Sequence, residues 1–347
     1  MLAIAASVQA QASNFGPGGT YSGLFYEPEG YWEQSSGTIT VTTTPTGKYS
    51  GKLRVGTQNY SFSGQFNPDG TASRGIHRAD RNDLLVRMEI DSEDPDLIYG
   101  TIIDGIWTSD LYADRMIYNG KTSVCPDAGQ YTLLIPGDFN STTEPGGDSF
   151  ATVTVDTKGR LRCAASLADG TKFSQSSTVS KGGLWPLYAP LYQGGGSIYS
   201  WMLFNESMEE QLGGDVVWIK PEMSWTSYYP DGFAIQVSSW GSRYYKPLKG
   251  EKVLDLTEAA VEFNGGNLYE SFTNHVSLDS NNRVFNFSPN ALSLKFSLGN
   301  GTFTGKVQDP STGYTLSVRG VALQYYGVAA GYFSDYSLTG EIWMEQW

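Results

Sequence analysis

The sequence predicts an all-β protein of two antiparallel lobes, barrel- or sandwich-like, that are built from a repeated hairpin or meander unit. Apolar and polar residues alternate along most of the chain, as in GTITVTTT (37–44), LLVRMEID (84–91) and ATVTVD (151–156). Turn signals such as PTG, NPDG and ADG separate these segments. The chain is also rich in glycine, with 41 residues, and in aromatic residues, at 14%, which is typical of exported β proteins.

The repeated unit is a hairpin that is found three times when the sequence is compared with itself. The copies are TGKYSGKLRVGTQNYSFSGQF (46–66), KGRLRCAASLADGTKFSQSSTV (158–179) and GNGTFTGKVQDPSTGYTLSVRGV (299–321). Each combines a turn glycine, a strand, a second polar turn and an alternating strand. Repetition of such a unit favours closed or sandwiched sheets, because closure removes exposed strand edges.

The boundary between the two lobes is expected in the turn-rich segment NGKTSVCPDAG (119–129). We therefore predict an N-terminal β lobe over residues 13–122. The C-terminal β lobe covers residues 123–347 and contains two of the three hairpins.

Residues 1–12 resemble the remnant of a signal peptide, since an apolar run is followed by the small-x-small pattern Ala10-Gln11-Ala12. We expect a secreted or extracellular protein, with the periplasm as the alternative. No segment has the roughly 18 continuous apolar residues of a membrane span. Cys125 and Cys163 fit an oxidising compartment, and the sequence leaves open whether they are bonded to each other.

Charge and motifs exclude several classes of function. The net charge of −13 argues against nucleic-acid binding, which needs a basic stripe. The cysteine spacing does not match a zinc site, and no phosphate-cradling glycine loop opens a helix, so we predict no metal and no cofactor. His77 and His275 are the only histidines, so few residues are available for the histidine of a Ser-His-Asp triad.

One part of the sequence resembles a known module. The succession GTYSGLFY, SSGTITVT, GKYSGKLRVG and YSFSGQF, followed by ADGTK (168–172) and WPLYAPLY (185–192), is similar to a β-rich module of large secreted proteins from environmental bacteria. The likeness covers nearly all of the chain after residue 12. That module has no established activity, so the resemblance implies no catalytic residues. The aromatics and carboxylates of PEMSWTSYYPDGF (221–233) are additional to it and leave room for an activity of this chain's own.

Aromatic and acidic residues gather in one region between the second and third hairpins, where the regular alternation fails. Flat sugar faces stack on aromatic rings, while acids hold the hydroxyl groups. We therefore predict a secreted module that binds a carbohydrate or another cell-surface ligand. The alternative for the same cluster is packing between the lobes. The predicted binding residues are Trp218, Trp225, Tyr228, Tyr229, Trp240 and Tyr244, with Tyr245 beside them.

A second hypothesis of a different class is a glycoside hydrolase, which needs only two carboxyl groups and no cofactor. Glu222 is the candidate acid, because we expect Trp218 and Trp225 to shield it from water and raise its pKa. Asp231 is the candidate partner carboxylate, with Glu209 or Glu210 as a substitute.

WPLYAPLY (185–192) is either an aromatic shelf for a ligand or a piece of core. The two prolines argue against a central strand. We expect this stretch to cross between sheets as a core element that joins the lobes, burying Leu187, Leu191 and one face of Trp185.

Overall fold

The computed structural model describes residues 15, 16, 18–205 and 211–347. In this part of the chain the fold class is confirmed, because all regular elements are antiparallel strands apart from three short 3-10 turns. These turns are η1 (Glu33–Ser35), η2 (Tyr192–Gly194) and η3 (Gln324–Tyr326). Within the same residues, no helix is long and apolar enough to cross a membrane. The predicted signal segment, residues 1–12, and the acids Glu209 and Glu210 lie outside the described residues.

The strands form three sheets of eight strands each. The first sheet contains β1 (Gly19–Tyr26), β2 (Gly37–Thr43), β3 (Lys48–Val55), β4 (Gln58–Gln65), β5 (Thr71–Ile76), β6 (Leu84–Ile90), β7 (Leu97–Ile103) and β8 (Thr108–Met116). The second sheet contains β9 (Gly129–Ile135), β10 (Ser149–Val155), β11 (Arg160–Ser166), β12 (Lys172–Thr178), β13 (Leu184–Leu191), β14 (Gly196–Phe204), β15 (Leu212–Lys220) and β16 (Phe233–Tyr244). The third sheet contains β17 (Glu258–Gly265), β18 (Phe272–Leu278), β19 (Val284–Asn286), β20 (Leu292–Ser297), β21 (Thr302–Gln308), β22 (Thr315–Leu323), β23 (Val328–Ser334) and β24 (Thr339–Gln346).

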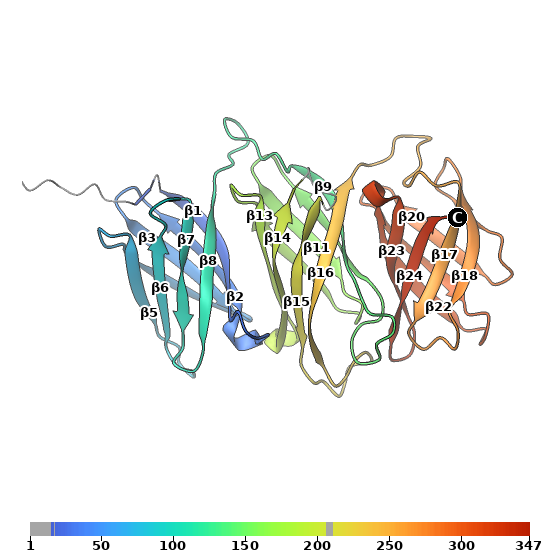
Figure 1. The fold of residues 1–347 in the computed structure, drawn as a ribbon, viewed down its shortest axis with the longest axis horizontal. Helices are drawn as coiled ribbons and strands as arrows, with labels where there is room; N and C mark the ends of the chain where they lie inside the picture. Colours follow the sequence, from blue (N-terminus) through green and yellow to red (C-terminus); the bar gives the residue numbers. More distant parts are fainter. Residues whose placement is uncertain (1–14, 17, 206–210) are drawn as a thin grey trace, which may run out of the picture. The chain divides into compact units, whose positions relative to one another are not determined.

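All three sheets have the same topology, in which neighbours along the chain pair and the first strand pairs with the last (Figure 1). The first sheet has the order β4-β3-β2-β1-β8-β7-β6-β5, the second β12-β11-β10-β9-β16-β15-β14-β13, and the third β19-β18-β17-β24-β23-β22-β21-β20. Each sheet is therefore a nearly closed meander with one seam, which lies between the fourth and fifth strands of the first two sheets and between the third and fourth strands of the third. Closure of this kind leaves little exposed strand edge.

The chain divides into two compact units, with a change between Met116 and Ile117. The first unit holds the first sheet, and the second unit holds the other two sheets. Two of the three similar hairpins, 46–66 and 158–179, are the third and fourth strands of their sheets, whereas 299–321 supplies the fifth and sixth strands of the third sheet.

Each sheet encloses its own apolar core through the alternation that the sequence shows. In β6, for example, Leu84, Val86, Met88 and Ile90 are buried, whereas the residues between them are less so. Burial of such side chains contributes about 25 cal/mol per Å² of apolar surface removed from water. The inward residues of the three sheets form three separate core clusters.

A fourth apolar cluster lies within the second unit, between the outer faces of the second and third sheets. Leu134 and Phe150 of the second sheet pack there with Val321, Leu323 and Tyr332 of the third. The hydroxyl of Thr132 on β9 also donates to the carbonyl oxygen of Ala322, at 2.7 Å. Strand β9 is therefore buried on both faces, which explains its continuous apolar run.

The stretch WPLYAPLY forms most of β13, so the expectation of a crossing between sheets is wrong. β13 pairs with β14 only and lies at the seam of the second sheet, where Pro186 and Pro190 remove no ladder hydrogen bond. The side chain of Gln175 on β12 bridges this seam. It accepts from the indole N–H of Trp185 at 3.0 Å and donates to the carbonyl of Pro186 at 2.9 Å. The stretch is core, as expected, and the whole of Trp185 is buried.

Cys125 and Cys163 are free thiols, and both are buried. Burial raises the pKa of Cys125 to about 11 and that of Cys163 to about 12. Because the thiolate is the reactive form, these two residues are inert packing groups.

We predict that Leu187→Ala in β13 lowers the free energy of unfolding by about 2–5 kcal/mol, because it leaves a cavity in the core of the second sheet. Leu203→Ala on the neighbouring strand is the control, since the Leu203 side chain is exposed, and we expect a change within about 0.5 kcal/mol. Urea denaturation measures both. Equal effects of the two substitutions would contradict the core position of β13.

Candidate functional site

A pocket of about 270 Å³ opens in the second unit at the rim of the contact between the second and third sheets. Pockets for drug-sized ligands measure about 300–1,000 Å³, so this one has room for a group the size of a single ring. Its walls come from the end of β9, the connection between β9 and β10, β16 and β24. The lining residues are Leu134, Pro136, Gly137, Asp138, Phe139, Asp148, Trp240, Glu341 and Trp343.

The connection between β9 and β10 is rich in glycine because it approaches the third sheet closely. A Cβ atom on Gly147 would lie 2.4 Å from Cβ of Tyr332 and 2.5 Å from the carbonyl oxygen of Gly340. Without a side chain at this position, the amide of Asp148 donates to the carbonyl of Gly331 at 3.1 Å. The connection is thereby docked on β23 and β24, and Asp148 faces the pocket.

Asp148 is buried without a basic partner. Its Oδ1 accepts a hydrogen bond from the amide of Gly137 at 3.0 Å, and only 3% of the residue is exposed. Burial, together with the negative charge of Glu341, raises the pKa of Asp148 to about 8, while the Gly137 hydrogen bond acts in the opposite direction. A large part of the Asp148 carboxyl is therefore protonated at neutral pH.

Glu341 is the second carboxyl group of the pocket, on β24. Burial raises its pKa, the hydrogen bond from Asn264 Nδ2 at 3.1 Å lowers it, and the charge of Glu262 raises it. None of the residues that line the pocket in the described chain is basic. The carboxyl groups of Asp148, Glu341 and Asp138 thus line one pocket without a basic residue among the described lining residues, an arrangement that is concentrated at functional sites.

Two tryptophans form the apolar wall of the pocket. The ring centroids of Trp240 and Trp343 are 6.3 Å apart with an angle of 57° between the planes. Trp343 is oriented by a hydrogen bond from its Nε1 to Glu345 Oε2 at 2.9 Å, and Trp240 packs edge-on against Tyr326 at 4.6 Å. Phe139, which is 42% exposed, lies at the mouth.

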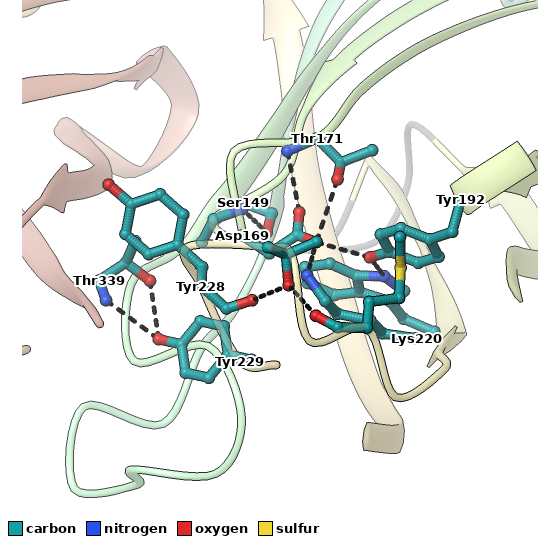
Figure 2. Close-up of polar contacts among 12 residues, drawn as sticks. Ser149, Asp169, Thr171, Tyr192, Lys220, Tyr228, Tyr229 and Thr339 are labelled. Carbon is teal, nitrogen blue, oxygen red and sulfur yellow. Dashed lines mark hydrogen bonds and ion pairs between the residues drawn. The ribbon is translucent and has the colours of Figure 1, made fainter. Parts of the chain in front are cut away.

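Tyr229 holds the walls of the pocket together. Its hydroxyl accepts a hydrogen bond from the amide of Gly146 at 3.1 Å. It also accepts one from the amide of Thr339 at 3.0 Å and lies 3.0 Å from the Thr339 hydroxyl (Figure 2). Tyr229 is buried and has a left-handed backbone with φ of 49°, which is unfavourable for a bulky residue. One side chain therefore links the β9–β10 connection to the start of β24, two residues from Asp148 and two from Glu341.

Trp218 belongs to a second polar cluster, inside the second sheet. Asp169 lies at its centre and accepts from Lys220 Nζ at 2.9 Å and from the Tyr192 hydroxyl at 2.7 Å (Figure 2). The hydroxyl of Thr171 is a further donor at 3.0 Å. Trp218 Nε1 in turn donates to the Tyr192 hydroxyl at 2.9 Å. This buried ion pair is well supplied with partners, and Trp218 has a structural role in it.

Glu222 and Asp231 lie in the loop between β15 and β16, beyond the last strand pair, Lys220 with Phe233. One hydrogen bond crosses this loop, from the amide of Met223 to the carbonyl of Pro230 at 2.7 Å. Both acids are exposed. The expected shielding of Glu222 by two tryptophans is absent, because Trp218 is buried in the second sheet and Trp225 is 77% exposed.

The remaining predicted residues are distributed between packing and surface. The Tyr228 hydroxyl donates to the carbonyl of Asp335 at 2.9 Å, and the buried Tyr244 donates to the carbonyl of Leu298 at 2.8 Å. Tyr245 is 67% exposed. Of the predicted binding residues only Trp240 lines the pocket, while Tyr229 supports it. The sequence prediction missed Asp148, Glu341, Trp343 and Phe139.

No protein-family model matches the chain, and no curated protein matches it. Three solved structures are similar over most of its length at 10% sequence identity. They are intact transferrin-binding protein B described as Ap-TbpB (TM-score 0.24, covering 95% of this chain and 76% of that chain), transferrin-binding protein B from Neisseria meningitidis (0.23, 94% and 76%) and an endo-1,5-α-L-arabinanase from Thermotoga petrophila (0.25, 91% and 82%). Such low scores and identities support no conclusion about function.

We predict that Asp148→Asn removes a pH dependence of stability. The unfolded carboxyl titrates near its ordinary pKa of about 3.9, and the folded one at about 8. Between these values the folded state binds the extra proton, so the stability of the wild type falls as the pH rises through this window. The variant retains an oxygen for the Gly137 amide and has no such proton.

Asp148→Asn is therefore expected to gain stability relative to the wild type by up to about 1.4 kcal/mol per pH unit between about pH 4 and pH 8. Urea denaturation at several pH values measures the difference. Asp231→Asn is the control, because it changes the same charge at an exposed position. A difference that is constant with pH would mean that Asp148 ionises normally.

Proposed function

We propose that this protein is a secreted carbohydrate-binding module whose ligand site is the pocket of Trp240, Trp343, Asp148 and Glu341. The observation that carries this proposal is the meeting of two indole rings and two carboxyl groups in one pocket. The C–H faces of a sugar ring pack on tryptophan, and carboxyl groups bind hydroxyl groups with directional hydrogen bonds. The volume of about 270 Å³ fits one sugar unit at a time.

The position of the site on outward faces also supports a binding role. Trp343 and Glu341 alternate along β24 with Ile342 and Met344, which belong to the core of the third sheet. Glu341 and Trp343 therefore do not pack in the core of the third sheet. Large side chains that lie outside a core mark binding sites more often than buried core residues do.

We predict that Trp343→Ala weakens binding of a glycan ligand at least about tenfold, or 1.4 kcal/mol. A glycan array and pull-downs on insoluble polysaccharides identify the ligand, and titration of that ligand measures the loss. Trp343→Phe, which keeps an aromatic face, is expected to retain most of the affinity. The matched control is Trp225→Ala on the exposed β15–β16 loop.

The comparison of these two tryptophans separates two possible sites. Loss of binding in Trp343→Ala and Trp240→Ala alone supports the pocket. Loss in Trp225→Ala alone would move the site to the β15–β16 loop, where Glu222, Tyr228 and Asp231 lie. No binding to any glycan by the wild type would remove the proposal.

A second candidate function is glycoside hydrolysis by Glu222 and Asp231. The observation in its favour is that both acids lie in one short loop, between the last β15–β16 pair, Lys220 with Phe233, and the hydrogen bond from the Met223 amide to the Pro230 carbonyl. The hypothesis requires a carboxyl separation of about 5–5.5 Å, as in retaining glycosidases. The exposure of both side chains argues against it, because no apolar shield favours a protonated acid.

If this second function holds, the purified chain releases chromophore from at least one aryl glycoside between about pH 4 and pH 8. Glu222→Gln and Asp231→Asn would then each reduce the rate about 10²–10⁴-fold. Asp148→Asn and Glu341→Gln belong in the same assay, because they are the carboxyl pair of the pocket. If the wild type releases chromophore from none of the substrates, the hydrolase hypothesis is rejected and the binding module remains. If both loop variants stay active, Glu222 and Asp231 are excluded as the catalytic residues.

A further inference from the structure

We propose, building on the proposed function, that the pocket at the rim of the second and third sheets binds a positively charged amino group, so that its ligand is an amine-bearing sugar. The pocket combines Asp148, Glu341 and Asp138 with the indole rings of Trp240 and Trp343. Carboxyl groups and aromatic faces together are the means by which proteins bind organic cations.

The first step is the charge of the pocket, because all of its charged lining residues are acidic. The titratable groups around Asp148 are Glu341 on β24 and Asp138 in its own connection, and Glu262 on β17 acts on Glu341. In the described chain neither a lysine nor an arginine lines the pocket. Asp169, by contrast, is paired with Lys220, and Asp96 with Arg115. A bound ammonium group would supply the missing countercharge.

The second step is hydrogen-bonding capacity. A carboxylate offers about four lone-pair positions. Asp148 uses one for the Gly137 amide, and Glu341 uses one for Asn264. An ammonium group carries three donors, which suits two carboxyl groups that face the same space.

The third step is the aromatic wall. A cation within about 6 Å of a tryptophan ring centroid is attracted to the ring face, by about 0.5–2 kcal/mol depending on desolvation. The centroids of Trp240 and Trp343 are 6.3 Å apart, so one group that lies beside both rings can be within about 6 Å of each centroid. A metal ion would gain nothing from these rings, because it needs oxygen ligands.

Binding of a cation is coupled to proton release. Burial keeps the pKa of Asp148 high in the free protein, so that its carboxyl holds a proton over part of the neutral range. A positive charge beside this carboxyl favours its ionised form. An ammonium ligand therefore displaces a proton from the site, whereas a neutral sugar does not.

Isothermal titration calorimetry of the full chain at about pH 7 tests the proposal with three oligosaccharides of equal length, made of glucosamine, N-acetylglucosamine and glucose. Each is titrated in two buffers of different ionisation enthalpy, so that proton release is read from the difference in enthalpy. We expect glucosamine oligomers to bind at least about tenfold more tightly than the other two, with up to one proton released per site.

Variants separate the pocket from general attraction of a cation to an acidic protein. Trp343→Ala leaves the net charge unchanged and is expected to abolish the preference for glucosamine. Asp148→Asn is expected to abolish the proton release, and Glu341→Gln is expected to weaken glucosamine binding. Asp255→Asn, which removes one exposed carboxylate outside every candidate site, is expected to behave as the wild type. A preference that survives in Trp343→Ala would overturn the proposal.

The proposal and the proposed function fail in different ways. If neutral oligosaccharides bind as tightly as glucosamine and Trp343→Ala weakens them all, the glycan site stands and the charge preference is refuted. If no sugar binds and tetramethylammonium does, the cation site stands without the glycan function. If neither sugars nor tetramethylammonium bind, the cation site is refuted. It is also refuted if calcium chloride binds and competes with the sugars for the pocket.

Discussion

Apolar packing between the outer faces of the second and third sheets is the contact on which the candidate site depends. An antiparallel sheet usually packs one face on its core and leaves the other in water. Here Leu134 and Phe150 point out of the second sheet, and Val321 and Ala330 point out of the third, so each apolar patch covers the other. The pocket forms at the rim, where this packing ends and side chains of both sheets face a common space. Tyr229 fixes that rim with hydrogen bonds to both walls.

Asp127, Asp148, Asp169 and Asp309 of the second unit are buried, and Asp148 and Asp169 differ in how their charge is compensated. Asp169 has a lysine, a tyrosine hydroxyl and a threonine hydroxyl within 3.0 Å, as a structural ion pair requires. Asp148 has one backbone amide and a second acid nearby. Leaving such a group buried costs stability, and proteins tolerate this mainly at sites that bind or react. This contrast supports the proposal that Asp148, rather than the larger polar cluster, belongs to a ligand site.

The sequence predicted the fold class well because alternation reports directly on which side of a strand is buried. It did not predict the pocket, because the walls of the pocket come from segments that are distant in the chain. Trp218 and Trp240 lie on consecutive strands, but one points into the second sheet and the other out of it. The alternation of residues along β16 does show on which face Trp240 lies. Phe233, Ile235 and Val237 pack on the core of the second sheet, and Trp240 falls on the opposite face. Asp148 and Glu341 meet only through sheet-to-sheet packing, for which the sequence carries no local signal. The misjudged β13 has a similar cause, because proline is excluded from central strands but not from a seam.

Alternate residues of β24 face the core and the pocket, so substitutions at the two sets of positions have different effects. On β24, Ile342 and Met344 face the core of the third sheet, whereas Glu341 and Trp343 face the pocket. A substitution at an inward position leaves a cavity and destabilises the sheet. A substitution of Glu341 alters the charge of the pocket without opening a cavity in that core, whereas a substitution of Trp343 also removes a ring that packs on the apolar cluster between the two sheets. The constraint that does act on the pocket is the docking of the β9–β10 connection, where Gly147 admits no side chain and Tyr229 adopts a strained backbone. Ligand preference can therefore vary through residues 341 and 343, while the residues that position the walls stay fixed.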